Sequence, residues 1–255
     1  MIKKIAILTL KKADILTSVA IRLVKLTGKS SHAVHPKHLL NERVWFQKYL
    51  KGSDRVLDLG CGSGQYILKI APKVKMCFGL DVDKKAISFA QKQAKEKLLK
   101  NIKFLIFDAN RKLPFANNYF DEVIVSDTLE HLEKRSFVLS QINRVLKKSG
   151  LLFLVTDNPQ TSWKKIQKSA GLFYYADKDH KYEYSKEEIV KILIQKGFKI
   201  LSLKPVTYDT PLKPFIDLVG GLSLNLYSKL SKWRKRLVLK NPNETTGFRI
   251  VALAK

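Results

Sequence analysis

The chain has 255 residues, with 48 Lys and Arg against 22 Asp and Glu, so its formal net charge at pH 7 is +26. This length fits one large domain, or one domain with insertions, and the charge favours anionic partners such as nucleic acid, anionic membrane or phosphorylated substrates. The lysines are spread along the whole chain, however, so solvated helix faces without any polyanionic partner explain the charge equally well. Two cysteines, Cys61 and Cys77, do not suggest a disulfide framework, and reduced, cytoplasmic thiols are the simplest interpretation. No apolar run approaches the roughly 18 to 20 residues of a membrane span, and no signal peptide is expected.

The first predicted element is helical. Lys11, Arg22 and Lys25 lie off an apolar stripe with helical spacing, whose members are Leu8, Ile15, Leu16, Val19, Leu23 and Leu26. Residues 1–51 hold 11 Lys and Arg against 2 Asp and Glu, which makes this the start of a basic segment. We assign residues 1–50 to an N-terminal helical cap.

From Arg55 onward, apolar runs alternate with helical patterns. The runs lack period-two alternation, as in a sheet covered on both faces, and they occupy 56–59, 76–80, 102–107, 120–126, 151–156, 198–203 and 247–254. Helices are expected near 65–71 and at 84–98, 132–147 and 185–197, the last opened by a capping box of Ser185 and Glu188. The order predicts an α/β fold with a doubly wound, mostly parallel sheet, formed by residues 51–206 and completed by a last strand in residues 247–255.

A glycine-rich turn at residues 56–64, VLDLGCGSG, is the most informative segment. It follows a buried strand and precedes a helix, and Asp81 closes the next strand. Glycines let the backbone approach a ligand, the helix N-terminus offers free N–H groups, and a carboxylate after the second strand can take both ribose hydroxyls. The dinucleotide pattern needs a glycine at position 65 or 67, where the chain has Gln65 and Ile67. The spacing is therefore G-x-G-x-G, with Asp58 two residues before the first glycine.

This turn resembles the first motif of class I S-adenosylmethionine (SAM) methyltransferases. Further blocks make the chain similar to their type 11 group, which includes ubiquinone and menaquinone biosynthesis enzymes: FGLDVD at 78–83, FDAN at 107–110 and FDEVIVSDTLEHL at 120–132, with weaker matches at 144–155 and 183–200. The resemblance covers roughly residues 45–204 and the last strand. It implies a Rossmann-like, seven-stranded sheet in the order 3-2-1-4-5-7-6 with an antiparallel last strand, and SAM as the cofactor. It says little about the acceptor molecule, because proteins that share a fold can have different functions.

The resemblance also implies a set of cofactor contacts. Its members are Asp58 for the ammonium group of SAM, Gly60, Gly62 and Gly64 for room around the methionine moiety and ribose, Asp81 for the ribose hydroxyls, Val82 for packing on adenine, Asp108 and the backbone N–H of Ala109 for the adenine edge, and Ser126 near the methionine end. For Asp81 and Asp108 the alternative is a helix N-cap.

Catalytic residues are harder to assign from the pattern. Methyl transfer is an in-line displacement in which positioning supplies much of the rate, and a base is needed only where the nucleophile must lose a proton. His131 is the leading candidate base, and His180 is the second, since the resemblance places it beside the acceptor pocket. Asp127, Glu130 and His131 also resemble a divalent-metal cluster, but Lys134 stands where a further acidic ligand is expected. Structural hydrogen bonds at a helix start are the third interpretation, and we assign no metal.

The expected function is SAM-dependent methylation of a small-molecule, lipid-linked or glycan acceptor, on oxygen or carbon. An RNA methyltransferase, suggested by the charge of +26, and a SAM-binding protein without turnover are the alternatives. No Asn-Pro-Pro-Tyr-type block follows the fourth strand, so nucleic acid is not the favoured substrate. The expected location is the cytoplasm, either free or in peripheral contact with an anionic membrane.

Residues 207–246 form an insertion before the last strand. Their apolar residues fall at spacings of three and four: Phe215, Leu218, Val219, Leu222, Leu226, Leu230, Trp233 and Leu237. Basic residues crowd the end of the stripe: Lys229, Lys232, Arg234, Lys235 and Arg236. We expect a basic amphipathic lid whose apolar stripe is buried, either over the acceptor side of the site or against an anionic membrane.

Overall fold

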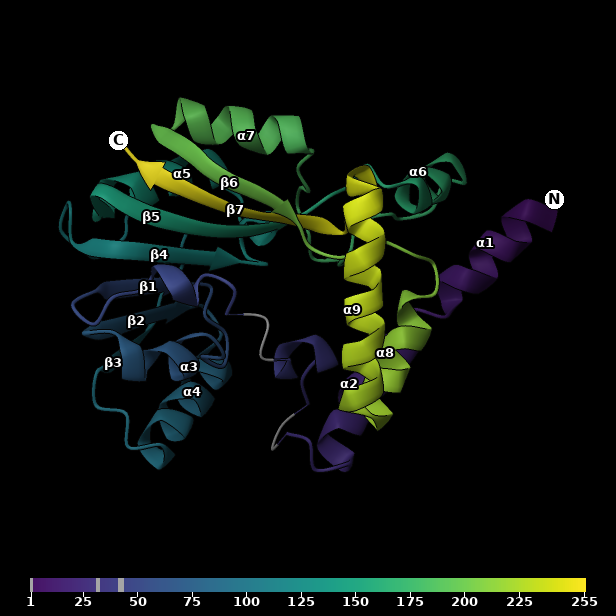
Figure 1. Ribbon diagram of the computed structural model, residues 1–255, viewed down its shortest axis with the longest axis horizontal. Coiled ribbons are helices and arrows are strands. Elements are labelled where there is room, and N and C mark those ends of the chain that lie inside the picture. Colours follow the sequence, from purple (N-terminus) through teal and green to yellow (C-terminus); the bar gives the residue numbers. More distant parts are fainter. Residues whose placement is uncertain (1, 31–32, 41–43) are drawn as a thin grey trace. The chain divides into compact units, whose positions relative to one another are not determined.

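The computed structural model describes residues 2–30, 33–40 and 44–255 (Figure 1). The chain divides into an α/β unit, made of residues 44–158, 179–204 and 247–255, and a helical unit, made of residues 1–43, 159–178 and 205–246. The sequence patterns placed residues 159–178 in the α/β domain, whereas the structure groups this segment, with its helix α6 (Ser162–Ser169), with the helical unit.

The α/β unit is built on one seven-stranded sheet in the order β3-β2-β1-β4-β5-β7-β6. Its strands are β1 (Arg55–Leu59), β2 (Met76–Asp81), β3 (Ile102–Ile106), β4 (Phe120–Ser126), β5 (Leu146–Asp157), β6 (Phe198–Pro205) and β7 (Gly247–Ala254). The pairs β2–β3, β1–β2, β1–β4 and β4–β5 are parallel, and β7 runs antiparallel to β5. The predicted strand order and the antiparallel last strand are confirmed, so β1, β2 and β4 end at one edge of the sheet (Figure 1).

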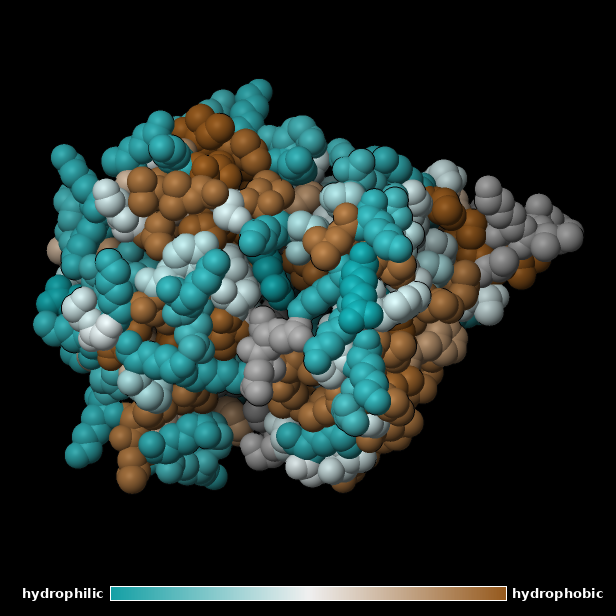
Figure 2. Space-filling view, viewed as in Figure 1, coloured by the Kyte–Doolittle hydropathy of each residue, from teal (hydrophilic) through white to brown (hydrophobic). Residues whose placement is uncertain are grey.

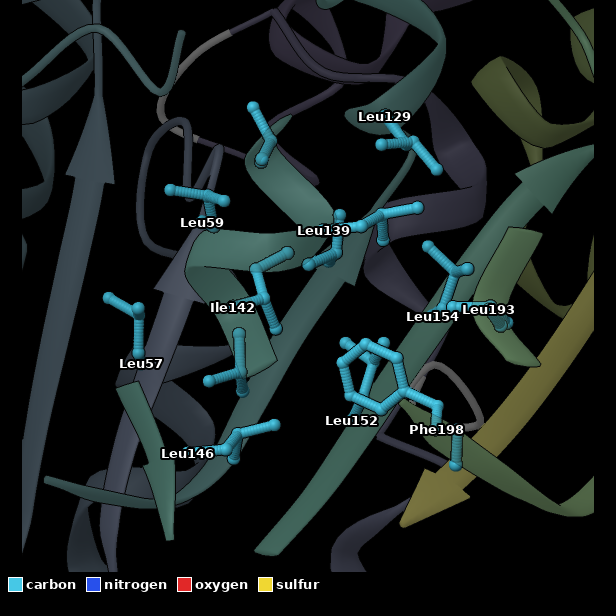
Figure 3. Close-up of a cluster of buried hydrophobic side chains, with 14 of the residues drawn as sticks. Leu57, Leu59, Leu129, Leu139, Ile142, Leu146, Leu152, Leu154, Leu193 and Phe198 are labelled. Carbon is cyan, nitrogen blue, oxygen red and sulfur yellow. The ribbon is translucent and has the colours of Figure 1, made fainter. Parts of the chain in front are cut away.

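Helices cover both faces of this sheet. On one face, α5 (Arg135–Val145) and α7 (Lys186–Gln195) pack on alternate residues of β1, β4 and β5; Figure 3 shows Leu57, Leu139 and Leu152 within this cluster. On the other face, α3 (Ile67–Ile70) and α4 (Lys84–Glu96) pack on the intervening residues, with the short 3-10 helices η3 (Gln47–Tyr49) and η4 (Ala71–Lys73) nearby. Burial of both faces explains why the strands are continuously apolar.

Local differences from the predicted elements have local causes. The helix expected at 132–147 ends at Val145, because Leu146 already pairs with Phe120 and a register shift then adds residues to β5. The helix expected at 65–71 is shorter and tightens into η4 at its end. The capping box of α7 is confirmed: Glu188 N–H donates to Ser185 Oγ at 3.2 Å, and Ser185 N–H donates to Glu188 Oε2 at 2.8 Å.

Besides α6, the described part of the helical unit contains two pairs of helices where the sequence suggested two longer helices. They are α1 (Ile2–Lys12), α2 (Ile15–Leu26), α8 (Lys213–Leu222) and α9 (Leu224–Lys240), with 3-10 helices η1 (Pro36–Leu39) and η6 (Pro242–Glu244). Ser223 is extended and caps α9 by accepting from Leu226 N–H, which separates α9 from α8. Helix α8 packs on α2 at Gly221, where a Cβ would lie 2.9 Å from the carbonyl oxygen of Ala20. Only a residue without a side chain permits this approach.

A buried carboxylate, Asp217, joins α8 to the N-terminal segment. Its Oδ2 accepts from Lys213 Nζ at 2.8 Å and from Thr17 Oγ1 at 3.0 Å, and Tyr227 Oη donates to its Oδ1 at 3.3 Å. His35 Nε2 lies 3.2 Å from Oδ2. Burial alone would raise the pKa of Asp217, but the charge of Lys213 and the hydrogen bond from His35 outweigh it and hold that pKa well below its ordinary value.

The apolar stripe of the insertion does not form the buried face of its helices, so the packed-lid form of the prediction is wrong, whereas burial against a membrane stays a prediction. Phe215, Leu222 and Trp233 are 45%, 59% and 50% exposed. The buried residues of α8 and α9 are instead Pro214, Ile216, Asp217, Gly220, Gly221, Tyr227, Arg234 and Val238. Arg234, expected on a basic surface, is buried and donates from Nε and Nη2 to the carbonyl oxygen of Tyr208. The packed face follows the small residues and the polar network rather than the largest apolar side chains; the lid function stays a prediction.

Across residues 2–30, 33–40 and 44–255, no helix combines the length and the apolar character that crossing a membrane requires.

Candidate cofactor and acceptor site

The glycine turn after β1 has left-handed backbone at all three glycines. Gly60, Gly62 and Gly64 have φ values of +77°, +51° and +75°. A Cβ on Gly60 would lie 2.3 Å from Thr128 Oγ1, whereas a Cβ on Gly62 would meet no atom within 4 Å. Gly60 therefore packs the turn against the loop after β4, and Gly62 leaves open space above it.

Two carboxylates face this turn from the ends of β1 and β2. Asp58 is 1% exposed, and its Oδ2 has no hydrogen-bond partner. Burial, followed by the charge of Asp81, raises the pKa of Asp58 to about 8. Asp81 accepts from Gly62 N–H at 2.7 Å and from Asp83 N–H at 2.9 Å. Asp83, rather than Asp81, is the N-cap of α4, because it accepts from the N–H groups of its first turn.

The loop after β3 places Asp108 and Ala109. Asp108 Oδ1 accepts from Asn110 N–H at 2.9 Å and from Asn110 Nδ2 at 3.0 Å, which makes a local turn rather than a helix cap. The backbone hydrogen bond from Asn110 is the main reason that the pKa of Asp108 lies below its ordinary value. Ala109 is buried, whereas Val82 after β2 is 65% exposed and so has an apolar surface free for a ligand.

At the end of β4, Ser126 Oγ lies 2.9 Å from Tyr66 Oη, which comes from the segment after the glycine turn. The two predicted histidines are 49 positions apart in the sequence but meet in space. The rings of His131, in the 3-10 helix η5 (Leu129–His131), and His180 have centroids 4.6 Å apart at 79°. His180 Nδ1 lies 2.9 Å from Glu183 Oε1. Burial alone would lower the pKa of His180, but its hydrogen bond to Glu183 and the charge of Asp157 raise that pKa above its ordinary value.

The acidic groups around these histidines are arranged differently from the predicted cluster. Glu130 is fully buried, and its Oε1 accepts from Asp157 N–H at 2.8 Å. Burial, then the charges of Asp157 and Asp127, raise the pKa of Glu130 to about 8. Within the part of the chain that the structure describes, the only set of three metal-type ligands is Asp157, His180 and Glu183, and not Asp127, Glu130 and His131.

Comparison with known proteins identifies the family. A family model described as "Methyltransferase domain" matches residues 50–197, which is more than half of the chain. The chain belongs to the methyltransferase domain family.

Individual relatives agree with this assignment. The uncharacterized methyltransferase YcgJ of Bacillus subtilis is 32% identical over 105 residues, which make up 41% of each chain. The demethylmenaquinone methyltransferase of Leptospira interrogans is 26% identical over 68% of this chain and 77% of its own. The structure of a SAM-dependent methyltransferase from Methanosarcina mazei has a TM-score of 0.59 at 21% identity, over 84% of this chain and 99% of its own, and shares the fold. The match spans less than half the length of the first curated relatives.

As a member of this family, the methyltransferase uses S-adenosylmethionine as its cofactor. The residues around the glycine turn fit SAM. A buried carboxylate oxygen of Asp58 without a partner suits a cationic ammonium, and the open space above Gly62 suits the ligand itself. Asp81 stands at the end of the second strand of the methyltransferase sheet, where a ribose is held in folds of this kind.

Sequence reasoning did not anticipate three residues that the structure places beside the predicted site residues. Tyr66 was an available signal, since it is the first aromatic residue after the glycine turn and its hydroxyl reaches Ser126. Asp157 and Glu183 carried no comparable signal, because their approach to His180 depends on how the segment after α6 folds back toward β5.

Proposed function

We propose that this methyltransferase transfers the methyl group of SAM to a small apolar or lipid-linked acceptor, on oxygen or carbon, while in peripheral contact with an anionic membrane. The observation that carries the acceptor class is the outward-facing apolar surface of the helical unit. A glycan acceptor is compatible with the α/β unit but makes no use of that surface.

The cofactor contacts follow from positions at the strand ends. In this proposal Asp58 pairs with the ammonium group of SAM, Ser126 lies at the methionine end, and Gly60, Gly62 and Gly64 make room for the methionine moiety and the ribose. Asp81 accepts hydrogen bonds from the ribose hydroxyls. Val82 packs on the adenine ring, and Asp108 and the N–H of Ala109 bind the edge of that ring. The supporting geometry is the unpartnered oxygen of Asp58 and the exposed side chain of Val82.

Because the pKa of Asp58 is about 8 without a ligand, an ammonium partner would favour its ionised form. Binding of SAM at pH 7 is therefore expected to release a proton. Calorimetric titrations in buffers with different ionisation enthalpies measure this directly, and Asp58→Asn should abolish the buffer dependence.

His131 is the proposed base for an acceptor that must lose a proton. Its ring stands against His180, which Glu183 holds by a hydrogen bond, so the protein fixes the orientation of the pair. Much of the rate would come from alignment of the acceptor with the methyl group, and the base would add its effect only for protonated nucleophiles. His131→Ala should lower kcat more than it changes the KM for SAM.

The helical unit offers the surface that a membrane would contact. Exposed apolar side chains, with exposed fractions from 38% to 79%, lie on helices α1, α2, α8 and α9 of this unit: Ile5, Leu8, Ile15, Val19, Leu26, Phe215, Leu222, Leu226, Trp233 and Leu239. Figure 2 shows hydrophobic surface over α8 beside the hydrophilic surface along α9. Lys229, Lys232 and Arg236 are exposed on α9, among the turns that carry Leu226 and Trp233.

This combination suits an anionic bilayer better than water. Apolar side chains gain about 25 cal/mol for each Å² removed from water, and each nearby Lys or Arg adds about 1 kcal/mol of attraction to anionic lipid. Basic side chains between apolar turns are typical of helices that lie in the interface.

Vesicle co-sedimentation tests the membrane contact. We expect binding to phosphatidylglycerol-containing vesicles at low salt, weaker binding at high salt, and little binding to phosphatidylcholine alone. The double variant Leu226→Asp/Trp233→Asp should lose binding. Ile194→Asp is the matched control, because Ile194 is 55% exposed on α7 of the α/β unit. Absence of binding to anionic vesicles at low salt contradicts this part of the proposal.

Incubation with methyl-labelled SAM and cell extract tests the acceptor class. After partition into lipid, RNA, protein and small-molecule fractions, we expect label in the lipid or apolar small-molecule fraction. Label in RNA, with binding that falls steeply with salt, would replace the proposal by the RNA methyltransferase suggested by the charge. Binding of SAM without any labelled product would favour a cofactor-binding protein without turnover.

A further inference from the structure

Three ligand-type side chains of the α/β unit converge on one point beside the candidate acceptor base. Asp157 ends β5, and His180 and Glu183 lie three residues apart in the segment that leads into α7. One ligand atom from each lies within 4.8 Å of the other two. The side chains of His180 and Glu183 are 4% and 0% exposed, so this is a built interior arrangement and not a surface cluster.

The spacing suits an ion with octahedral coordination. His180 Nδ1 and Glu183 Oε1 are 2.9 Å apart. Two neighbouring ligands with bonds of about 2.1 Å lie about 3.0 Å apart in an octahedron and about 3.4 Å apart in a tetrahedron. A cation could therefore replace the proton between these two atoms without a large movement of either side chain.

Glu130 brings a second, independent observation. Its backbone oxygen accepts from the N–H groups of Lys181 and Tyr182 at 2.8 and 3.3 Å, and its Oε1 accepts from Asp157 N–H at 2.8 Å. Glu130 thus bridges the two segments that carry the cluster. Its other oxygen, Oε2, is buried and, apart from a contact with the Thr156 hydroxyl, has no hydrogen-bond partner. A buried carboxylate oxygen in this state is costly unless it is paired with a cation or bonded to a ligand.

We propose that Asp157, His180 and Glu183 bind a divalent transition-metal ion such as Mn²⁺, with Glu130 Oε2 accepting a hydrogen bond from a water on the ion. The imidazole favours a transition metal over Ca²⁺ or Mg²⁺, and the carboxylates favour Mn²⁺ over softer ions. The ion would lie beside His131, where its charge would attract an oxygen of an acceptor. This site is independent of the proposed acceptor class.

Calorimetry and electron paramagnetic resonance with MnCl₂ test the site on the full chain after treatment with a chelator. We expect one ion per chain. Glu183→Gln and Asp157→Asn should weaken binding by at least about tenfold. Glu133→Gln is the control, because Glu133 is a nearby acidic residue whose side chain is 67% exposed and pairs with Lys181. The affinity of this variant for Mn²⁺ should equal that of the original chain.

A second readout needs no variant. Nitrogen coupling in the electron spin-echo of bound Mn²⁺ is expected, because His180 supplies an imidazole ligand. Binding of S-adenosylhomocysteine by each variant verifies that its α/β unit is folded. The proposal is overturned by the absence of Mn²⁺ binding at millimolar concentration, by unchanged affinity in both ligand variants, or by bound Mn²⁺ without nitrogen coupling.

Discussion

The α/β unit and the helical unit bury their side chains in different ways. In the α/β unit, both faces of a parallel sheet are covered by helices, and nearly every large apolar side chain of β1, β4 and β5 is buried. In the helical unit, contacts form around Gly221, Ala20 and the polar network of Asp217, while Leu222 and Trp233 face outward. The first arrangement suits a rigid cofactor site, and the second leaves apolar surface for a partner.

The largest effect is expected from removing the polar centre of the helical unit. Asp217→Ala leaves Lys213, Thr17 and Tyr227 without their common acceptor and should cost about 3 to 5 kcal/mol of that unit's stability. Hydrogen exchange should accelerate in α2 and α8, while the α/β unit keeps its protection and binds S-adenosylhomocysteine. Asp14→Ala is the control, because the exposed pair of Asp14 with Lys11 is worth less than about 1 kcal/mol. Equal loss of protection in both units would show that they are not separate in stability.

A change in the glycine turn should act on the other unit. Gly60→Ala places a Cβ 2.3 Å from Thr128 Oγ1 at a φ of +77°. Left-handed strain of about 1 to 2 kcal/mol and overpacking of about 1 to 3 kcal/mol together predict a loss of about 2 to 5 kcal/mol. Gly62→Ala meets open space and should cost only the strain, so denaturant unfolding of the two variants separates packing from conformation. Equal stability of the two variants would refute the packing role of Gly60.

Lowering the pH should change the stabilities of the two units in opposite directions. Burial lowers the pKa of His35 to about 4, so between about pH 6.5 and 4 the unfolded chain binds a proton that the folded helical unit does not, and that unit loses stability as the pH falls. Burial raises the pKa of Asp58 to about 8 and that of Glu122 to about 9. These carboxyls stay protonated in the folded α/β unit while the unfolded chain ionises above about pH 4, so this unit gains stability as the pH falls.

Each of these groups contributes on the order of 2 to 3 kcal/mol between pH 7 and 5, so the two carboxyls together make the larger change. Hydrogen exchange at the two pH values, corrected for intrinsic rates, should show slower exchange in β1 and β4 and faster exchange in α2 and α8. A change of the same sign in both units would contradict this account of the buried groups.

The smallest of these effects concerns the cofactor alone. Asp81→Ala should weaken the binding of SAM by about 1 to 3 kcal/mol, because the charge-assisted hydrogen bonds to the ribose are lost. Asp83→Asn is the matched control, since an asparagine can keep the N-cap of α4 and lies two residues away. If both variants bind SAM like the unchanged chain, Asp81 does not hold the ribose.

The same contrast explains what could be predicted from the sequence. Strand order, the antiparallel β7, the capping box of α7 and the glycine turn were all expected, because each depends on local patterns or on a family resemblance with a specific motif. The buried face of α8 could not be predicted, since it follows from Gly221 meeting Ala20 and from Asp217 meeting Thr17, residues 200 positions apart in the chain. The meeting of Asp157, His180 and Glu183 likewise depends on a loop path that has no periodic signature.

Calorimetric titration of the purified full chain with SAM and with S-adenosylhomocysteine tests the central claim most directly. The account predicts that each ligand binds with one molecule per chain, and that binding at pH 7 releases a proton from Asp58. Absence of binding by either ligand at millimolar concentration would contradict the assignment of the glycine turn as a SAM site.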